Sequence, residues 1–166
     1  MDKRESKFKK EKSEFDQAVI DIARVTRVMA GGKRMRFRAC VVVGDRKGRV
    51  GMGLAKGADV SAAVQKAQRQ AEKHAISVNL VGETIAHEVR LKDGSARIVL
   101  KPAPAGTGII SGGAVRTVLE LVGIKNVVSK VLGTNNKINN VRAALKALAS
   151  LKIKKEKIKK EEEKPE

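Results

Sequence analysis

The sequence predicts an α+β protein built from two small α/β units. Apolar residues alternate with a period of two in several short stretches, recur every three or four residues in three others, and are separated by glycine-containing turns. The 166 residues suffice for one ordinary domain or two small ones. Hydrophobic residues make up 42% of the chain but aromatic residues only 2%, so we expect a core of Val, Ile, Leu, Ala and Met.

The two ends of the chain are charged and carry almost no apolar residues. We therefore expect residues 1–14 and 152–166 to be disordered arms, either simply solvated or in weak additional contact with RNA. Between them, a compositional change predicts a first unit over residues 15–78 and a second over 83–151. The connecting stretch is short and has no flexible composition, so the two units are expected to pack against each other.

The first unit begins with two strands joined by a glycine turn. The β-branched stretch 18–28 predicts the first strand, the AGGK sequence a turn, and residues 34–44 the second strand. Because strand residues alternate between faces, the second strand should separate its apolar side chains from its arginines. The apolar face would carry Met35, Phe37, Ala39, Val41 and Val43, and the opposite face Arg34, Arg36 and Arg38.

A third strand and a helix complete the predicted order β-β-β-α. The turn GDRKG leads into a strand in which Val50, Met52 and Leu54 alternate. Residues 59–76 show the spacing of an amphipathic helix, with Asp59 as its expected N-cap. This helix should cover the apolar face of the sheet and leave the arginine face free.

The second unit is predicted to have the order β-β-α-β-α. Two stretches, 84–92 and 96–101, flank KDGS as a hairpin, and a long loop follows over 102–113. Residues 114–123 predict a helix with Ser111 as a plausible cap and Gly123 as its stop signal. A short strand within 124–133 and a helix over 141–151 complete the unit.

The glycine loop of the second unit resembles a nucleotide-binding loop only superficially. The third glycine of Gly106-Thr107-Gly108 … Gly112 is one place late for a dinucleotide fingerprint, and no lysine lies in the loop to make it a P-loop. We therefore expect a structural connection that offers a contact to protein or RNA. The residues of this candidate contact are Gly106, Thr107, Gly108, Ser111 and Arg116.

No other pattern indicates catalysis, a metal or a cofactor. His74 and His87 lack ligand spacing to another His or Cys, and the acidic residues show no pairing suited to acid–base chemistry. Cys40 is the single cysteine, which excludes an intrachain disulfide and favours a buried thiol. The absence of a long apolar run predicts a cytosolic chain without a membrane partner.

The distribution of charge points to a polyanion as partner. The formal net charge is +18, and residues 24–56 hold ten basic residues against one acid, Asp45. Phe37 is expected on the core face, which argues against base stacking and favours recognition of RNA shape and backbone. The predicted RNA-binding residues are Arg24, Arg27, Gly31, Gly32, Lys33, Arg34, Arg36, Arg38, Arg46, Lys47, Arg49 and Lys56.

Two blocks of the sequence resemble one known family. The first comprises Gly32-Lys33, Phe37, Ala39, Val42-Val43-Gly44-Asp45, Gly48, Val50-Gly51, Gly53, Asp59-Val60 and Ala63. The second reads PAPAGTGIISGGAVRTVLELVGIKNVVSKVLGTNN followed by INNVRAALKAL. From about Phe15 to Leu151 the chain resembles bacterial small-subunit ribosomal protein five. Three positions depart from the family pattern: Ala30 replaces a usual cation, Met52 an aromatic residue and Lys137 a proline.

The resemblance implies more than the residues alone predict. It implies a first domain like the double-stranded-RNA-binding fold without its first helix, and a second domain with a left-handed βαβ crossover. The partners it implies are small-subunit ribosomal RNA, neighbouring ribosomal proteins of families four and eight, and messenger RNA near the path by which it enters the subunit. It also implies bracing of the head against the body, a role in decoding accuracy, a glycine loop near the spectinomycin site, and no homo-oligomer.

Three hypotheses about function follow from these observations. The first is a structural ribosomal protein located in the cytoplasm within the ribosome. The second is a free-standing regulatory protein that binds double-stranded RNA. The third is a nucleotide-dependent enzyme using the second unit, against which the missing phosphate-binding lysine and acid pairs argue.

Overall fold

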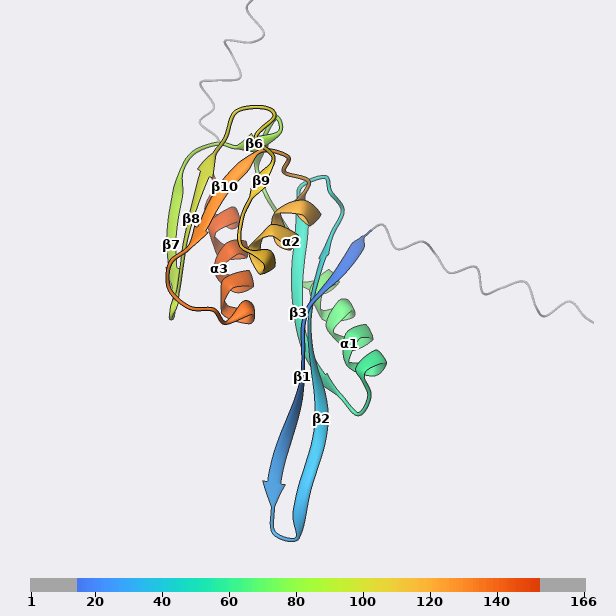
Figure 1. Ribbon diagram of the computed structural model, residues 1–166. Helices are drawn as coiled ribbons and strands as arrows, with labels where there is room; N and C mark the ends of the chain where they lie inside the picture. Colours follow the sequence, from blue (N-terminus) through green and yellow to red (C-terminus); the bar gives the residue numbers. More distant parts are fainter. Residues whose placement is uncertain (1–14, 153–166) are drawn as a thin grey trace, which may run out of the picture.

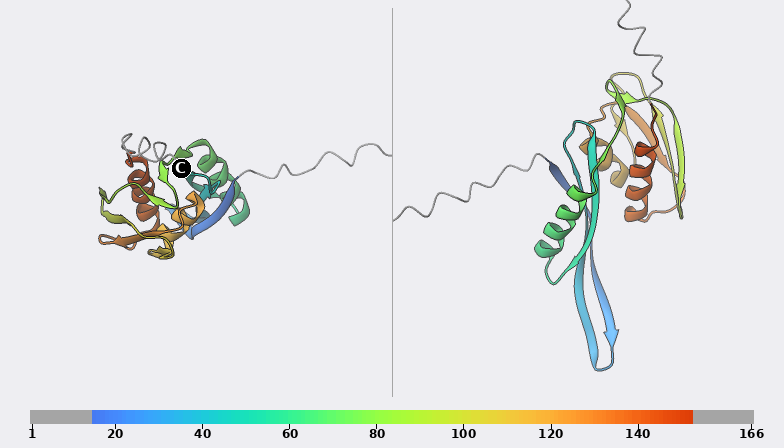
Figure 2. Two further views of the ribbon diagram at one scale, coloured as in Figure 1. Left: turned by 90° about the horizontal axis from the view of Figure 1, so that it is seen from above. Right: turned by 180° about the vertical axis from the view of Figure 1, so that it is seen from behind.

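The structure is a computed structural model, and it describes residues 15–152. These residues form four successive layers (Figures 1 and 2). Helix α1 lies on one side of an N-terminal sheet, and helices α2 and α3 lie on the other side, where they are backed by a C-terminal sheet. The α+β class with two units is confirmed. Apart from Lys152, the predicted arms lie outside the described residues. No helix in residues 15–152 is long and apolar enough to cross a membrane.

The N-terminal unit has the predicted order β-β-β-α. Its four strands lie in the order β1-β2-β3-β4, all antiparallel to their neighbours. The short strand β4, at the end of the predicted first unit, was not predicted and begins at the last residue of the predicted helix 59–76; it pairs only with the start of β3. The elements are β1 (Asp16–Met29), β2 (Gly32–Gly44), β3 (Arg49–Gly57), α1 (Val60–Lys73) and β4 (Ile76–Ser77).

Helix α1 approaches the sheet over glycines. A Cβ atom on Gly51 or Gly53 would lie 2.1 or 1.8 Å from a backbone oxygen of α1, so only glycine fits at these positions. The helix buries Ala63, Ala67 and Ala71 against this face. Alternation in β3 therefore places Val50, Met52 and Leu54 on the face opposite α1, whereas their apolar pattern had suggested the helix-facing side.

The second face of the sheet is also covered, which corrects the expectation of a free arginine face. Val42 and Val50 are fully buried in the large core cluster that includes residues of α2 and α3, and Met52 packs against it. The prediction that the units pack together is confirmed by this shared core. Only the part of β1 and β2 that extends beyond the C-terminal unit keeps its arginine face open (Figure 1).

The C-terminal unit contains the predicted hairpin, helices and central strand. Its main sheet has the order β7-β8-β10-β9, with β9 parallel to β10 and α2 between them. Strands β5 and β6 form a separate pair, and β9 lies within the stretch predicted as a loop. The elements are β5 (Leu80–Val81), β6 (Thr84–Ile85), β7 (Val89–Asp93), β8 (Ala96–Pro102), β9 (Ile109–Ile110), α2 (Gly113–Val122), β10 (Val127–Val131) and α3 (Lys137–Ala149).

The helix ends agree with the sequence in part. Gly123 ends α2 in the left-handed conformation with φ 95°, as predicted. Asp59 is the N-cap residue of α1, but its side chain makes no capping hydrogen bond. Ser111 does not cap α2, because Gly112 holds the N-cap position. Helix α3 begins four residues earlier than predicted because the side chain of Asn136 accepts a hydrogen bond from the backbone of Ile138.

The turn between β2 and β3 joins the two units through backbone contacts. The N–H groups of Arg46 and Gly48 donate to the carbonyl oxygens of Leu121 and Val122 at the end of α2. A Cβ atom on Gly44 would lie 2.2 Å from the Leu121 carbonyl oxygen, which shows how closely the units approach. These contacts hold the N-terminal sheet in a defined orientation against the C-terminal unit.

Candidate nucleic-acid interface

The β1–β2 hairpin extends beyond the rest of the protein as an arm (Figure 1). In β2 every residue from Ala39 to Gly44 is buried, whereas every residue from Gly32 to Arg36 is exposed. The facing end of β1, from Thr26 to Met29, is also exposed. A two-stranded hairpin without a covering layer has little stability of its own in water. The arm is therefore a surface suited to contact with another molecule.

A two-residue turn closes the arm at its tip. Met29 pairs with Gly32, so only Ala30 and Gly31 lie between the strands. Gly31 has φ 85°, at the second central position, where a type II turn requires glycine. Nothing lies within 4 Å of the Cβ position of Gly31 or Gly32, so the tip leaves room for close approach of a ligand. The predicted glycine turn is thus present and accessible.

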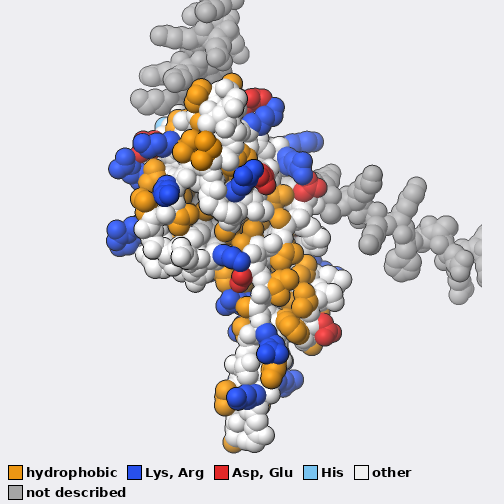
Figure 3. All heavy atoms as spheres, in the orientation of Figure 1, with side chains coloured by type: hydrophobic (Ala, Val, Ile, Leu, Met, Phe, Trp, Pro, Cys, Tyr) orange, Lys and Arg blue, Asp and Glu red, His pale blue; other side chains and the backbone are white. Residues whose placement is uncertain are grey.

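Five cations on the arm have no acidic neighbour in sequence. Between Ile22 and Phe37 the chain contains no Asp or Glu, and within the described residues none of these five side chains forms an ion pair. The space-filling view shows blue side chains spaced along the protruding arm (Figure 3). The five cations are Arg24, Arg27, Lys33, Arg34 and Arg36, all exposed.

Strand register places three of these cations on one face of the arm. Arg27 lies opposite Arg34, and Val25 opposite Arg36, so their side chains share the face that carries Lys56 of β3. These residues line a shallow groove of about 300 Å³ together with Thr26 and Met29. Lys33 and Arg24 project from the other face. The groove presents guanidinium groups whose planar forks match phosphate geometry.

Arg38 belongs to the same face but is partly engaged within the protein. Its guanidinium lies 3.7 Å from the carboxylate of Asp21, which also receives Lys137 of α3 at 3.3 Å. At the base of the arm, Asp21 therefore neutralises nearby cations, whereas the cations further out along the arm have no acidic partner. Lys137, one of the three departures from the family pattern, here links α3 to β1.

The predicted cations around the second turn form a separate group. Arg46 pairs with Asp16 at 2.8 Å, and the guanidinium of Arg49 lies 5.1 Å from the ring centre of Phe15. Lys47 is exposed, while its backbone donates to the Asp45 side chain. At about 3.3 Å per residue, the thirteen residues of β2 place this turn roughly 40 Å from the tip of the arm. The structure thus has two cationic areas where the sequence suggested one.

Apolar side chains accompany the cations on the arm. Val28, Met29 and Met35 are 70%, 48% and 52% exposed. Phe37 packs against the cluster beneath α1, as predicted, and is not presented for base stacking. The arm therefore combines charge with uncovered apolar surface, which favours burial against a partner over solvation alone.

Asn126 organises the glycine loop of the C-terminal unit. Its side-chain oxygen accepts hydrogen bonds from the backbone N–H groups of Gly106 and Gly108, both at 3.1 Å. Its own backbone oxygen accepts from Thr84 at 2.6 Å. The two amides that a phosphate would need are thus already engaged. Sequence analysis missed Asn126, since a lone Asn before a strand carries no motif.

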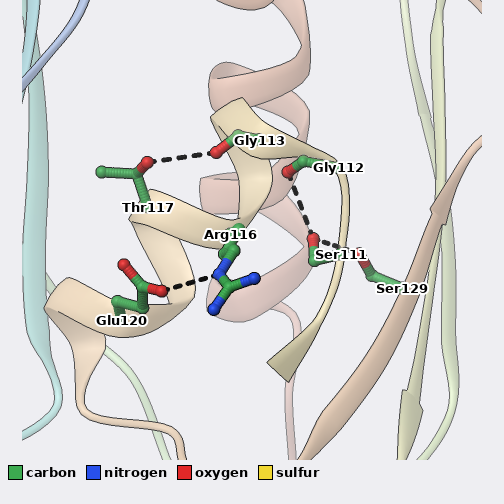
Figure 4. Close-up of polar contacts among 7 residues, drawn as sticks. All are labelled: Ser111, Gly112, Gly113, Arg116, Thr117, Glu120 and Ser129. Atoms are coloured by element: carbon green, nitrogen blue, oxygen red, sulfur yellow. Dashed lines mark hydrogen bonds and ion pairs between the residues drawn. The ribbon is translucent and has the colours of Figure 1, made fainter. Parts of the chain in front are cut away.

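Ser111 and Arg116 make contacts within the C-terminal unit (Figure 4). The hydroxyl of Ser111 lies 2.5 Å from that of Ser129, and Arg116 bonds Glu120 at 2.8 Å along the surface of α2. Thr107 donates to the carbonyl of Pro104. No catalytic pairing arises from these groups. Within residues 15–152 no three His, Cys, Asp or Glu side chains gather in a way that would hold a metal ion.

Cys40 lies in β2 and its side chain is buried, as predicted. It is 1% exposed, and burial, followed by the charge of Asp21, raises the pKa of the thiol from 9.0 to about 11. At neutral pH the side chain is a neutral thiol that packs as a small apolar group.

Comparison with known proteins reveals close relatives. Residues 15–79 match the family described as "Ribosomal protein S5, N-terminal domain", and residues 91–162 match "Ribosomal protein S5, C-terminal domain". The chain is 50% identical over 141 residues to "Small ribosomal subunit protein uS5" of Campylobacter jejuni, covering 85% of this chain and 96% of the relative. It is 46% identical over 148 residues to "Small ribosomal subunit protein uS5c" of Cyanophora paradoxa, covering 89% and 88% of the two chains.

Proposed function

Because this chain belongs to the ribosomal protein S5 family, we propose that it is a structural, RNA-binding constituent of the small ribosomal subunit, working in the cytoplasm within the ribosome. The single observation that carries its RNA-binding role is the arm of β1 and β2, which projects five cations without an acidic neighbour. The arm binds ribosomal RNA through the phosphate backbone, because guanidinium groups and an open glycine turn fit phosphates and no aromatic side chain is offered to bases.

The proposed binding residues fall into two groups with different tasks. Arg27, Lys33, Arg34 and Arg36, with Arg24 and Lys56, neutralise phosphates along the arm, and Gly31 and Gly32 allow the backbone to approach. Arg46, Lys47 and Arg49 belong to a second contact at the opposite end of β2, and Arg38 supports the base of the arm through Asp21.

Neighbouring ribosomal proteins are the second class of partner in this proposal. By resemblance to the family, these are the small-subunit proteins of families four and eight, with messenger RNA nearby. The C-terminal unit offers the contact: Ile110 and Leu132 are 54% and 62% exposed on it, and the loop from Gly106 to Ser111 is held in one shape by Asn126. Through these contacts the protein braces the head of the subunit against the body and contributes to decoding accuracy.

Co-sedimentation with small ribosomal subunits after a high-salt wash tests the proposal. A constituent of the subunit stays bound at about one copy per particle, because contacts with RNA and protein act together. A free-standing regulatory protein that binds double-stranded RNA would be released as salt weakens its phosphate contacts. Complete release of the chain from purified subunits would contradict the proposal.

A further inference from the structure

Helix α1 carries a third cationic surface, which the predicted RNA-binding residues do not include. Ala62, Gln65 and Gln70, with three cations, line an open groove of about 620 Å³ along the outer flank of the helix. The cations are Lys66, Arg69 and Lys73, all exposed. Residues spaced three, four and seven apart share one side of a helix, so the three charges form a single row.

The row is not neutralised by the protein. None of the three side chains forms an ion pair within residues 15–152. The acid of the same helix, Glu72, accepts a hydrogen bond from Gln68, away from the groove. Like charges three or four residues apart destabilise a helix. A row of such pairs with no counter-charge is complementary to a polyanion.

The α1 groove and the arm groove lie on opposite faces of the N-terminal sheet. Helix α1 packs on the sheet face formed by Ala39, Val41 and Val43, and its cations lie along its exposed flank, in the groove where the side chain of Gln70 accepts a hydrogen bond from the backbone of Leu54. The groove of the arm, with Arg27 and Arg34, opens on the other face of the same sheet. Figures 1 and 2 show α1 alone on its side of the sheet. A single phosphate backbone passing along the arm groove therefore does not pass along α1.

We propose that Lys66, Arg69 and Lys73 bind the phosphate backbone of a second RNA segment, so that the N-terminal unit bridges two RNA segments on opposite sides of its sheet. This inference rests on the proposed function and adds to it a third site and a bridging role. The side-chain NH2 groups of Gln65 and Gln70 donate hydrogen bonds to phosphate or ribose oxygens, while the Gln70 oxygen keeps its bond to the backbone N–H of Leu54. An acidic segment of a neighbouring protein is the competing occupant of the same surface.

Tethered cleavage of RNA tests where the two surfaces lie in the assembled subunit. An iron chelate attached to Gln65→Cys reports RNA beside α1, and one attached to Val25→Cys, which shares the groove face with Arg36, reports RNA beside the arm groove. The native Cys40 is buried with a raised thiol pKa, so it does not compete for the label. We expect both probes to cleave ribosomal RNA, at different nucleotides.

The outcomes separate this inference from the proposed function. Cleavage from Val25→Cys alone would overturn the α1 site and favour a protein occupant there, while leaving the arm as an RNA-binding surface. Absence of cleavage from both probes would contradict the proposed function as well. Cleavage of the same nucleotides by both probes would overturn the bridging of two segments.

A salt series provides a second, independent readout on the whole chain and small-subunit ribosomal RNA. Changing Lys66, Arg69 and Lys73 together to Gln keeps good helix formers on α1 and removes three charges. The slope of log affinity against log salt should flatten by roughly two to three units, at about 0.7–0.9 per phosphate contact. The matched control changes Lys154, Lys155 and Lys157 to Gln, outside the described residues. An equal change in both variants would overturn the site.

Discussion

Arg27 and Arg34 lie directly opposite each other in antiparallel register on the uncovered part of the β1–β2 arm. Both side chains are exposed, and no Asp or Glu lies between Ile22 and Phe37 to neutralise their charges. Like charges in this position destabilise a strand pair, so the free protein carries a repulsion that a polyanion would remove. The repulsion between Arg27 and Arg34 in the free protein therefore supports the proposal that the arm binds RNA.

The first prediction concerns the stability of this pair. Changing Arg34 to Gln should leave the free energy of unfolding unchanged or raise it by up to about 0.5 kcal/mol, because one repulsion of cross-strand size is lost. The same change should weaken binding to small-subunit ribosomal RNA. Urea unfolding and a binding titration check both effects. A loss of stability greater than about 1 kcal/mol would show that Arg34 has a structural role in the free protein.

The second prediction concerns the glycines of β3. Gly53→Ala should destabilise the protein by about 1–3 kcal/mol or more, because its new Cβ would meet the carbonyl oxygen of Ala67 and displace α1. Gly113→Ala is the matched control, since nothing lies within 4 Å of its Cβ position at the start of α2. The control should be neutral or stabilising by about 0.4–1 kcal/mol. Equal melting temperatures for the two variants would refute the packing described here.

The third prediction concerns the contact between the units. Gly44→Ala would place a methyl group against the carbonyl of Leu121 and separate the β2–β3 turn from α2. Because Val42 and Val50 share a core with α2 and α3, the unmodified chain should unfold in one cooperative transition. The variant should show two transitions by calorimetry. A single transition of unchanged width would indicate that the interface tolerates the methyl group.

The fourth prediction concerns Asn126. Replacing it with Ala leaves the N–H groups of Gly106 and Gly108 without their protein acceptor; because Gly106 is exposed and Gly108 half-buried, water takes over part of the bonding, and the cost should be about 0.5–1.5 kcal/mol per hydrogen bond. Amide hydrogen exchange at these two glycines should accelerate strongly in the variant. Unchanged exchange would mean that the loop is held by its other contacts, such as the bond between Val127 and Gly108.

The fifth prediction concerns pH and Cys40. Burial raises the pKa of the thiol from 9.0 to about 11, so near pH 8 it holds roughly 100-fold less thiolate than a free thiol and should react slowly with alkylating reagents. A group whose pKa is raised on folding contributes stability that is present below pH 9 and is lost as the pH approaches 11. Cys40→Ala should therefore lessen the alkaline loss of stability. Fast labelling of the folded protein at pH 8 would contradict this account.

Local patterns in the sequence predicted much of the fold. Period-two alternation identified the strands, and the helical spacing around Ala63 and Val118 identified α1 and α2. The pattern failed where both faces of a sheet are covered. From Ala39 to Gly44 every residue is buried, so alternation cannot show which layer each side contacts. For the same reason the glycines of β3, not its larger side chains, proved to face α1.

The composition of the sequence predicted which residues would bind a polyanion, but it did not predict how those residues are arranged in space. The density of Arg and Lys over residues 24–56 indicated a polyanion, but only register and strand length separate the arm from the turn at Arg46. Contacts between distant segments, such as Lys137 with Asp21 or Asn126 with Gly106, have no signal in local sequence. The spacing of Lys66, Arg69 and Lys73 can be read from the sequence. The direction in which these side chains point depends on which face of the sheet α1 covers.

The most direct test of the central claim is the salt dependence of RNA binding by the arm. Changing Lys33, Arg34 and Arg36 together to Gln removes three cations from the exposed part of β2 and leaves the core-facing Phe37 and Ala39 untouched. The matched variant, with Lys154, Lys155 and Lys157 changed to Gln, removes equal charge outside the described residues.

Binding of both variants to a small-subunit ribosomal RNA fragment should be measured across a salt series, with the melting temperature recorded for each. We expect the arm variant to keep its fold and to flatten the slope of log affinity against log salt by roughly two to three units, and the matched variant to flatten it much less. Equal slopes for the two variants would show that the charge acts only in bulk and would contradict the assignment of the arm as the RNA-binding surface.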